Sequence, residues 1–362
     1  MIGVVTTSYP RTPEDSAGVF VRERVRALQR EGHRIEILAA GERASSTDDA
    51  HISRIGAGNL FYSGGAPEAL EDARPWPRLA AWGQALAFSL SLLGRLTEQG
   101  RRWNAVESHW LLPCGLLVSM ALSKLPHRAH IHGGDLHLLA RLPWADSLGR
   151  VFCRTHPEIV FASAALHEGF AALIGAPPES LGARCQIEAA AFDKTVFRPH
   201  SAEERQRLRI ALSFTAPTLL AAGRLVPIKG FDVLVDAVGR IPPGLRPDLV
   251  IAGDGPERAR LASQACALGV HLRLPGQLGQ PLLAEHMAAA VLFVHPCRTL
   301  KSGRSEGMPL VVREALACNL AVIASASGGL REIEGNQGLR LVEPEDPAGL
   351  AAAIVGSETG DP

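Results

Sequence analysis

The richest chemistry in the sequence lies between residues 304 and 317, which read RSEGMPLVVREALA. Two glutamates flank a stretch suited to a loop and a helix start, in the order Glu306, Gly307, Met308, Pro309, Glu314. Pro309 fits the first turn of a helix, because the N–H that it lacks would be unpaired there. We expect Glu306 in the loop and Glu314 inside the helix, where ionised carboxylates can bind vicinal hydroxyls. The helix N-terminus, approached over Gly307, can receive an anion such as a diphosphate. Alone, two glutamates at this spacing are more typical of ordinary surface groups.

A basic loop at residues 222–231, AGRLVPIKGF, is the second candidate. It follows an apolar run and precedes a helical pattern, which is where phosphate sites occur in doubly wound folds. Arg224 and Lys229 can converge on one anion there. The chain has only four lysines against 33 arginines, so a lysine at this place favours a role for a compact point charge. A solvated basic loop is the alternative. Gly253 opens a further glycine-rich turn, GDGPE, which we interpret as mainly structural, with nucleotide contact as the alternative.

The first half of the chain carries histidines directly after two short apolar runs. His132 begins the sequence HGGD, which ends at Asp135, and His109 is followed by Trp110. We predict that His132 faces a ligand, with a purely structural histidine as the alternative. Trp110 could stack on a sugar or fill the core, and His109 could simply pack. Gly18 precedes a helical pattern and suits backbone contact with a phosphate.

Metal ligands do not stand out in the sequence. The six cysteines are widely spaced, with no CxxC pair, and we see no DxD carboxylate pair suited to a divalent cation. We therefore expect reduced thiols, no bound cofactor and chemistry that needs no metal.

Alternating apolar runs and helical patterns must position these residues. In the first half we expect helices at 19–30 and 116–123 and strands at 2–6, 35–39, 105–107, 129–131, 159–162 and 184–188. The rhythm restarts beyond a border near Pro199, with a helix at 205–212 and strands at 218–222, 249–252, 271–274, 292–295, 321–324 and 339–342. This pattern predicts two α/β, Rossmann-like doubly wound domains with mostly parallel sheets, residues 1–198 and 199–362. Their ligand cleft would lie between the carboxyl ends of the two sheets.

Composition limits the class of protein. The 362 residues are 46% hydrophobic and 20% charged, as in a folded soluble protein, with 37 basic and 37 acidic residues. This balance argues against nucleic acid as a partner. The N-terminus has no basic start and no long apolar run, so we expect no signal peptide and a cytoplasmic location. Residues 79–96 fall short of a membrane span and should form a buried or amphipathic helix. Nearby arginines leave open a peripheral contact with the inner face of a membrane: Arg74, Arg78, Arg95, Arg101 and Arg102.

Taken in order, the motifs resemble the retaining GT-B glycosyltransferases of the family-four type, which include many bacterial polysaccharide and glycolipid enzymes. The resemblance spans roughly residues 2–340. It is carried by GVF at 18–20, HWLLPCG at 109–115, HGGD at 132–135, GR and KG within 223–230, GDGP at 253–256 and the Glu306/Glu314 pair.

The resemblance implies transfer of a sugar from a nucleotide-diphosphate sugar, of the UDP or GDP type, to a saccharide or a lipid-linked acceptor. Arg224 and Lys229 would hold the diphosphate, Glu314 the ribose and Glu306 the donor sugar. The full donor side would comprise Gly18, Arg224, Lys229, Gly253, Glu306, Gly307, Met308, Pro309 and Glu314. His132 would sit beside the reacting carbon, and His109, Trp110 and Asp135 would lie on the acceptor side.

Three stretches depart from the family pattern. Residues 188–193, EAAAFD, replace the usual PNGVD, and Asn319 occupies a usual glycine position. The sequence ends 20 residues after Val342 (362 − 342), where family members usually continue into a helix that crosses back to the first domain. Two other readings therefore stay open: an epimerase or phosphorylase on the same architecture, or a catalytically weak subunit that needs a partner.

Overall fold

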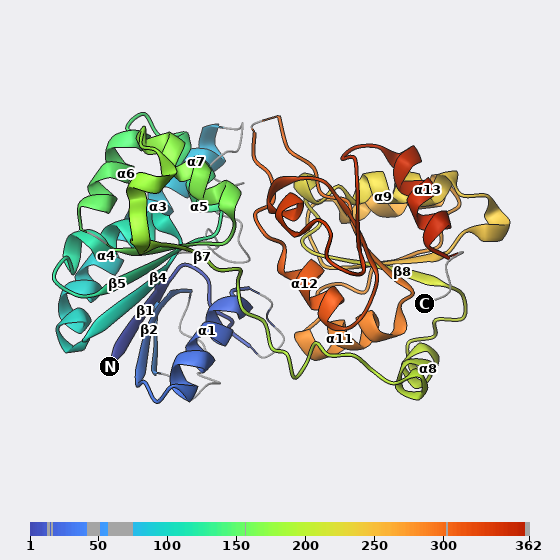
Figure 1. Ribbon diagram of the computed structural model, residues 1–362, viewed down its shortest axis with the longest axis horizontal. Helices are drawn as coiled ribbons and strands as arrows, with labels where there is room; N and C mark the ends of the chain where they lie inside the picture. Colours follow the sequence, from blue (N-terminus) through green and yellow to red (C-terminus); the bar gives the residue numbers. More distant parts are fainter. Residues whose placement is uncertain are drawn as a thin grey trace. The chain divides into compact units, whose positions relative to one another are not determined.

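The computed structural model describes residues 1–12, 15, 17–41, 51–56, 75–155, 157–301 and 303–358. The chain divides into two compact units, Met1–Ala191 and Phe192–Pro362 (Figure 1). The border therefore precedes Phe192, whereas the sequence placed it at Pro199. The reason is packing, because Phe197 is buried in the core of the second unit and Phe192 packs against that core.

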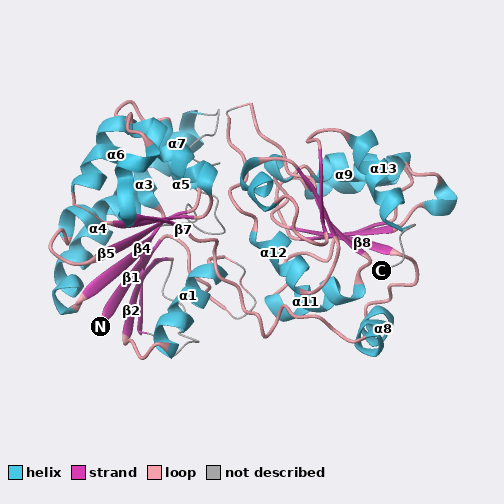
Figure 2. Ribbon diagram, viewed as in Figure 1, coloured by secondary structure: helices cyan, strands magenta, loops and turns pink. Residues whose placement is uncertain are grey.

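The first unit is built on a seven-stranded parallel sheet with the order β3-β2-β1-β4-β5-β6-β7. Its strands are β1 (Ile2–Thr6), β2 (Ile35–Ala40), β3 (His51–Ile55), β4 (Ala105–His109), β5 (His127–Ile131), β6 (Glu158–Phe161) and β7 (Cys185–Ile187). Its helices are α1 (Val19–Arg30), α3 (Pro75–Gln99), α4 (Leu116–Ala121), α5 (Gly134–Ala140), α6 (Ala145–Arg154) and α7 (Ala164–Ile174). Helices α3 to α7 cover one face of the sheet and α1 lies on the other (Figure 2).

The second unit is built on a six-stranded parallel sheet with the order β10-β9-β8-β11-β12-β13. Its strands are β8 (Thr218–Ala222), β9 (Asp248–Ala252), β10 (Leu272–Arg273), β11 (Leu292–His295), β12 (Val322–Ser325) and β13 (Leu339–Val342). Its helices are α8 (Ala202–Ala211), α9 (Phe231–Arg240), α10 (Arg258–Ala267), α11 (Gln280–Ala289), α12 (Leu310–Ala317) and α13 (Pro347–Glu358). Two buried apolar clusters, one on each face of the sheet, tie these helices to the strands. Buried on both faces, the strands are nearly continuous apolar runs.

Most predicted elements are confirmed, several to the residue. Strands β1, β8, β11 and β13 and helix α1 have the predicted bounds. Asn319 has a left-handed φ of 56°, so it fulfils the role of the family's glycine after α12. Strand β3 was missed because it is a short, partly exposed edge strand whose sequence, HISRI, alternates apolar and polar residues and so carries little apolar signal.

Helix α3 is apolar on two faces. Ala81, Phe88, Leu92 and Leu96 are buried against the sheet. The opposite side carries exposed large side chains: Trp76, Leu79, Trp82, Leu86 and Leu90. Within the described part of the chain, no helix combines the length and apolarity needed to cross a bilayer. The prediction of a buried or amphipathic helix is thus confirmed for its inner face, and its outer face carries exposed apolar side chains. Arg74 lies outside the described residues.

Candidate active site

The second unit brings Lys229 and Glu306 together although 77 positions separate them in the sequence. Lys229 ends a short 3-10 turn (Pro227–Lys229) after β8, and Glu306 lies in the loop between β11 and α12. Strands β8 and β11 are neighbours, so the loops at their carboxyl ends meet. The Lys229 Nζ donates to Glu306 Oε2 at 2.9 Å, and the two side chains are only 16% and 18% exposed. The two residues predicted to bind the diphosphate and the sugar thus form one site.

His295, at the end of β11, is a member of this site that the sequence reading missed. Its ring is fully buried, and neither ring nitrogen has a hydrogen-bond partner among the residues that the structure describes. Burial, and secondly the charge of Lys229, lowers the pKa of His295 to about 3, so the ring is neutral. Burial alone would raise the pKa of Glu306, but the positive charge of Lys229 opposes it and the pKa is lowered. The only sequence signal was a polar residue that ends the apolar run LFVH.

Glycines let neighbouring loops meet at this edge of the sheet. A Cβ on Gly328, whose φ is 56°, would overlap the carbonyl oxygen of Glu306, and Gly329 N–H donates to the Gly307 carbonyl at 2.9 Å. The turn after β12 therefore braces the loop that carries Glu306. Gly253 has a φ of 145°, and its Cβ would overlap the Gly223 carbonyl. Its close approach is thus to the chain's own backbone, in line with the mainly structural interpretation.

The start of α12 differs slightly from the expectation. Pro309 is the residue before the helix, with φ −68° and ψ 118°, rather than part of the first turn, and Val312 N–H donates to its carbonyl. Gly307 and Met308 precede it and are partly exposed. The first N–H groups of α12 therefore lie directly after the loop of Glu306, as an anion site requires.

Glu314 lies inside α12 as predicted, but its charge state differs from the expectation. Its side chain is buried, 3% exposed. Burial raises the pKa of Glu314 to about 8, although a hydrogen bond from Gln280 and the charge of Arg313 act in the opposite direction. At neutral pH the protonated carboxyl predominates. Such a group can donate one hydrogen bond as well as accept, whereas the sequence reading assumed an ionised, acceptor-only carboxylate.

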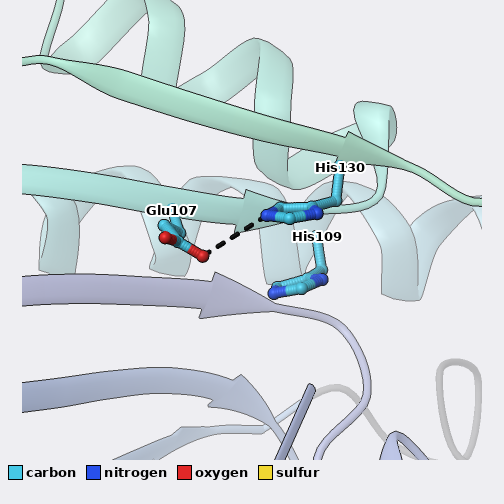
Figure 3. Close-up of side chains that lie close together, drawn as sticks. All are labelled: Glu107, His109 and His130. Atoms are coloured by element: carbon cyan, nitrogen blue, oxygen red, sulfur yellow. Dashed lines mark hydrogen bonds and ion pairs between the residues drawn. The ribbon is translucent and has the colours of Figure 1, made fainter. Parts of the chain in front are cut away.

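In the first unit, a row of polar side chains ends strands β4 and β5. Glu107 and His109 lie two residues apart in β4, so their side chains point to the same face of the sheet. The strand register pairs His109 with His130 of β5. Figure 3 shows the stacked rings of His109 and His130 beside the Glu107 carboxylate. The ring centroids of the two histidines are 4.4 Å apart, and their planes are 11° from parallel.

Arg24 of α1 holds Glu107 with two hydrogen bonds, Nε to Oε2 at 2.9 Å and Nη2 to Oε1 at 2.6 Å. His130 Nε2 lies 3.3 Å from Oε2. Burial would raise the pKa of Glu107, but the contacts with His130 and Arg24 prevail and lower it to about 2. Glu107 is therefore ionised. Arg24 and His130 were not anticipated, and the signal that could have found them is the alternation of charged and polar residues in strands that are otherwise apolar.

These contacts bear on the capacity for metal binding. Glu107, His109 and His130 each offer a ligand atom within 4.8 Å of the others. However, Arg24 already occupies both carboxylate oxygens, and nearly parallel rings direct their lone pairs along similar lines rather than toward one point. The set therefore fits a hydrogen-bonded network better than a cation site. Metal-independent chemistry stays a prediction.

His132 follows β5 and is half-buried among aromatic rings. Its Nε2 lies 3.2 Å from Nδ1 of His109. The centroids of Phe20 and Trp110 are 4.6 and 4.9 Å from its own. Burial, and secondly the charge of His130, lowers the pKa of His132 to about 3. A small cavity against this cluster is lined by His132, Phe20 and Ala189 among others.

Asp135 and Gly18 have clear structural roles. Both carboxylate oxygens of Asp135 are buried acceptors for backbone N–H groups, from Leu111 at 2.6 Å, Gly133 at 2.9 Å, Leu136 at 3.0 Å and His132 at 3.2 Å. Asp135 therefore holds the His132 loop in place, rather than presenting its carboxylate to an acceptor. Gly18 begins α1 with a φ of 73°, and a Cβ there would overlap the Ser8 carbonyl.

Comparison with known proteins links the second unit to a family. Residues 216–357, which contain the Lys229, Glu306 and Glu314 site, match the family described as Glycosyl transferases group 1. The second unit is therefore similar to the group 1 glycosyl transferases, and the matched region lies wholly within it. Arg224, half-buried in the same loop as Lys229, also lies in the matched region.

The relatives of this chain carry the names of several glycosyltransferases. The GDP-mannose-dependent alpha-(1-6)-phosphatidylinositol monomannoside mannosyltransferase of Mycobacterium tuberculosis is 35% identical over 213 residues, 56% of this chain and 52% of that protein. The D-inositol 3-phosphate glycosyltransferase of Thermomonospora curvata is 34% identical over 50% of this chain and 44% of its own length. The chain thus spans about half the length of these relatives. A Bacillus subtilis protein named for teichuronic acid biosynthesis, TuaC, is 25% identical over 97% of this chain and 87% of its own length.

Solved structures show that the chain has the GT-B fold. Anabaena Alr3699/HepE, solved with UDP and glucose, has a TM-score of 0.72 at 19% identity, covering 99% of this chain and 90% of that one. An alpha,alpha-trehalose-phosphate synthase (UDP-forming) from Burkholderia vietnamiensis has a TM-score of 0.72 at 17% identity, covering 99% and 92%. The predicted α/β architecture of two Rossmann-like domains is confirmed. Active-site contacts across a cleft stay a prediction.

Proposed function

We propose that this protein moves a sugar from a nucleotide-diphosphate sugar, of the UDP or GDP type, to a saccharide or lipid-linked acceptor, with retention and without a metal. The observation that carries the proposal is the Lys229–Glu306 ion pair at the carboxyl ends of β8 and β11, beside the N-terminus of α12. The relatives' names support it, since one is GDP-mannose-dependent and structural neighbours are solved with UDP.

The main physical task in such a reaction is to stabilise a departing diphosphate while the sugar carbon gains positive charge. Lys229, Arg224 and the first N–H groups of α12 would supply fixed positive potential where the negative charge develops. Glu306, ionised and held by Lys229, would accept hydrogen bonds from donor-sugar hydroxyls. Glu314 would bind the ribose, with its proton available for donation to one hydroxyl oxygen.

On the acceptor side, His132 would lie beside the reacting carbon. The acceptor hydroxyl would attack on the face that the diphosphate leaves, and the departing phosphate oxygen would take its proton. This route needs no covalent nucleophile and no resident cofactor. The nucleotide sugar would be a co-substrate.

A thermal-shift panel of UDP, GDP, ADP and their common sugar conjugates tests donor binding. We expect one nucleotide family to raise the melting temperature, because a ligand at 100 times its dissociation constant adds about 2.7 kcal/mol of stability. Arg224→Ala should reduce the shift, and Arg340→Ala, which removes another arginine of the same unit, should not. If no nucleotide shifts the melting temperature, the proposal fails and a binding subunit that needs a partner becomes the better reading.

We propose in addition that the outer face of α3 contacts an anionic membrane surface, where lipid-linked acceptors reside. Leu86 and Leu90 are each 62% exposed, and Trp76 and Trp82 lie on the same helix. The helix carries no charged side chain between Arg78 and Arg95, so the charges that flank its apolar stretch are both positive. Aromatic and aliphatic groups with basic neighbours are typical of helices that lie in the plane of a membrane interface. The cytoplasmic location stays a prediction.

The double variant Leu86→Glu/Leu90→Glu is expected to bind vesicles of phosphatidylglycerol and phosphatidylcholine at least tenfold more weakly, because burying each leucine is worth about 1.5–3 kcal/mol. Co-flotation with such vesicles measures the effect. Gln84→Glu, at an exposed position of the same helix, adds one charge away from the leucines and should change binding little. Equal flotation of the wild type and the double variant would contradict the proposed contact.

A further inference from the structure

We propose that His109 is a positioning residue that fixes the tautomer of His132, so that His132 carries its proton on Nδ1 and its lone pair on Nε2. The consequence for transfer rests on the proposed function, whereas the tautomer itself does not. The inference starts from one partly buried contact, 3.2 Å between Nδ1 of His109 and Nε2 of His132. One of these two nitrogens must donate and the other must accept, because both rings are neutral.

The first arrangement has His132 Nε2–H donating to His109 Nδ1. A neutral His109 that accepts at Nδ1 must then carry its own proton on Nε2. That nitrogen is buried, and no described residue gives it a hydrogen-bond partner. An N–H group without an acceptor would thus remain in the protein interior, which costs about 1–3 kcal/mol.

The second arrangement has His109 Nδ1–H donating to His132 Nε2. The unpartnered Nε2 of His109 then bears only a lone pair, and buried acceptors without partners are tolerated better than buried donors. The second arrangement is therefore favoured, and it leaves the proton of His132 on Nδ1.

The surroundings of His109 allow it to act as a fixed donor. Its ring is 2% exposed and stacks on His130, which in turn contacts Glu107. Arg24 locks Glu107 through two hydrogen bonds. Figure 3 shows this sequence of contacts from Glu107 to the stacked rings. Because His109 cannot turn without breaking the stack, His132 receives a donor in one orientation.

The proposed consequence concerns the group that His132 offers to a substrate. An isolated histidine prefers its proton on Nε2, so His109 would reverse the ordinary preference. With Nε2 engaged by His109, His132 would present an Nδ1–H donor to a substrate oxygen rather than a base. Its lowered pKa agrees with a ring that stays neutral throughout the physiological pH range.

The test is nitrogen NMR of the protein labelled with ¹⁵N-histidine, with the His132 signals identified by their loss in His132→Gln. In the wild type we expect the pattern of an Nδ1–H tautomer. His109→Phe keeps a ring against His130 but removes the donor, so the His132 pattern should move toward Nε2–H. His33→Gln, at a half-exposed position, is the matched control and should leave the His132 signals unchanged.

Two results would overturn the inference: an Nε2–H pattern for His132 in the wild type, or an unchanged Nδ1–H pattern in a folded His109→Phe. If the phenylalanine variant does not fold, His109→Gln replaces it, and its mobile amide should give a mixture of tautomers. In a transfer assay with an accepted nucleotide sugar, His109→Phe should lower kcat about fivefold to tenfold and leave the KM for the nucleotide sugar unchanged, as expected for loss of one oriented hydrogen bond. A protein that transfers no sugar but shows the expected tautomer would refute the proposed function and retain this inference.

Discussion

Lys229→Ala is expected to lower kcat/KM for sugar transfer by about 10²–10³, which is the loss typical of removing one charge-stabilising group from an active site. Lys229 is the cation that Glu306 already orders, at 2.9 Å, so its position is fixed before the diphosphate charge develops. Steady-state transfer assays with the donor found in the thermal-shift panel measure the effect. The loss should fall mainly on kcat, since the charge on the leaving group is greatest in the transition state.

The lysine variant needs two controls. The first is required because the variant also leaves Glu306 partly buried without its cation. Lys229→Ala/Glu306→Gln removes the unpaired charge, so its melting temperature separates a folding defect from a loss of catalysis. Lys124→Ala removes an exposed lysine of the first unit and should retain full activity. A Lys229→Ala protein with wild-type kcat/KM would show that Lys229 has no part in transfer.

Asp135→Ala is expected to destabilise the first unit by about 3–5 kcal/mol. The carboxylate accepts from four backbone N–H groups, and alanine would leave these donors without a partner. Urea unfolding followed by circular dichroism measures the change, with the transition of the first unit analysed separately if the two units unfold in turn.

The matched control for Asp135 is Asp146→Ala in the same unit. Asp146 is half-exposed, pairs with the exposed Arg150 and accepts a hydrogen bond from Ser147, so its loss should change stability far less than the loss of Asp135. Asp135→Asn, which keeps one acceptor oxygen, should fall between the two. Equal unfolding midpoints for Asp135→Ala and Asp146→Ala would disprove the scaffold role.

The fold was largely predictable because parallel strands that are covered on both faces must be apolar runs, and such runs are plain in the sequence. Strands β8 and β11 show this, since both match their predicted bounds. Helix α1 was equally plain, with its apolar face and the glycine after it. The edge strand β3 lacks two covered faces and so lacks the signal.

The site was predictable only where local sequence carried it. Glu306 and Lys229 stood out by their motifs, but their ion pair depends on the adjacency of β8 and β11, which spacing alone does not fix. Asp135 was placed on the acceptor side because the sequence shows a carboxylate and does not show the four N–H groups around it. The charge state of Glu314 depends on how deeply its side chain is buried, which no sequence motif states. Arg24 lies on a helix far from the histidines in sequence, so no motif links it to them.

The position of the border between the units bears on how the second one could be produced alone. Phe192 and Phe197 lie edge to face, 6.2 Å apart, and Phe197 fills the interior beside Phe214 and Leu220. A polypeptide starting at Pro199 would lack both aromatic side chains. The apolar cluster to which α11 and α12 contribute would then be partly exposed to water. The fragment suited to isolated nucleotide-binding work therefore starts at Phe192 or within the alanines that precede it.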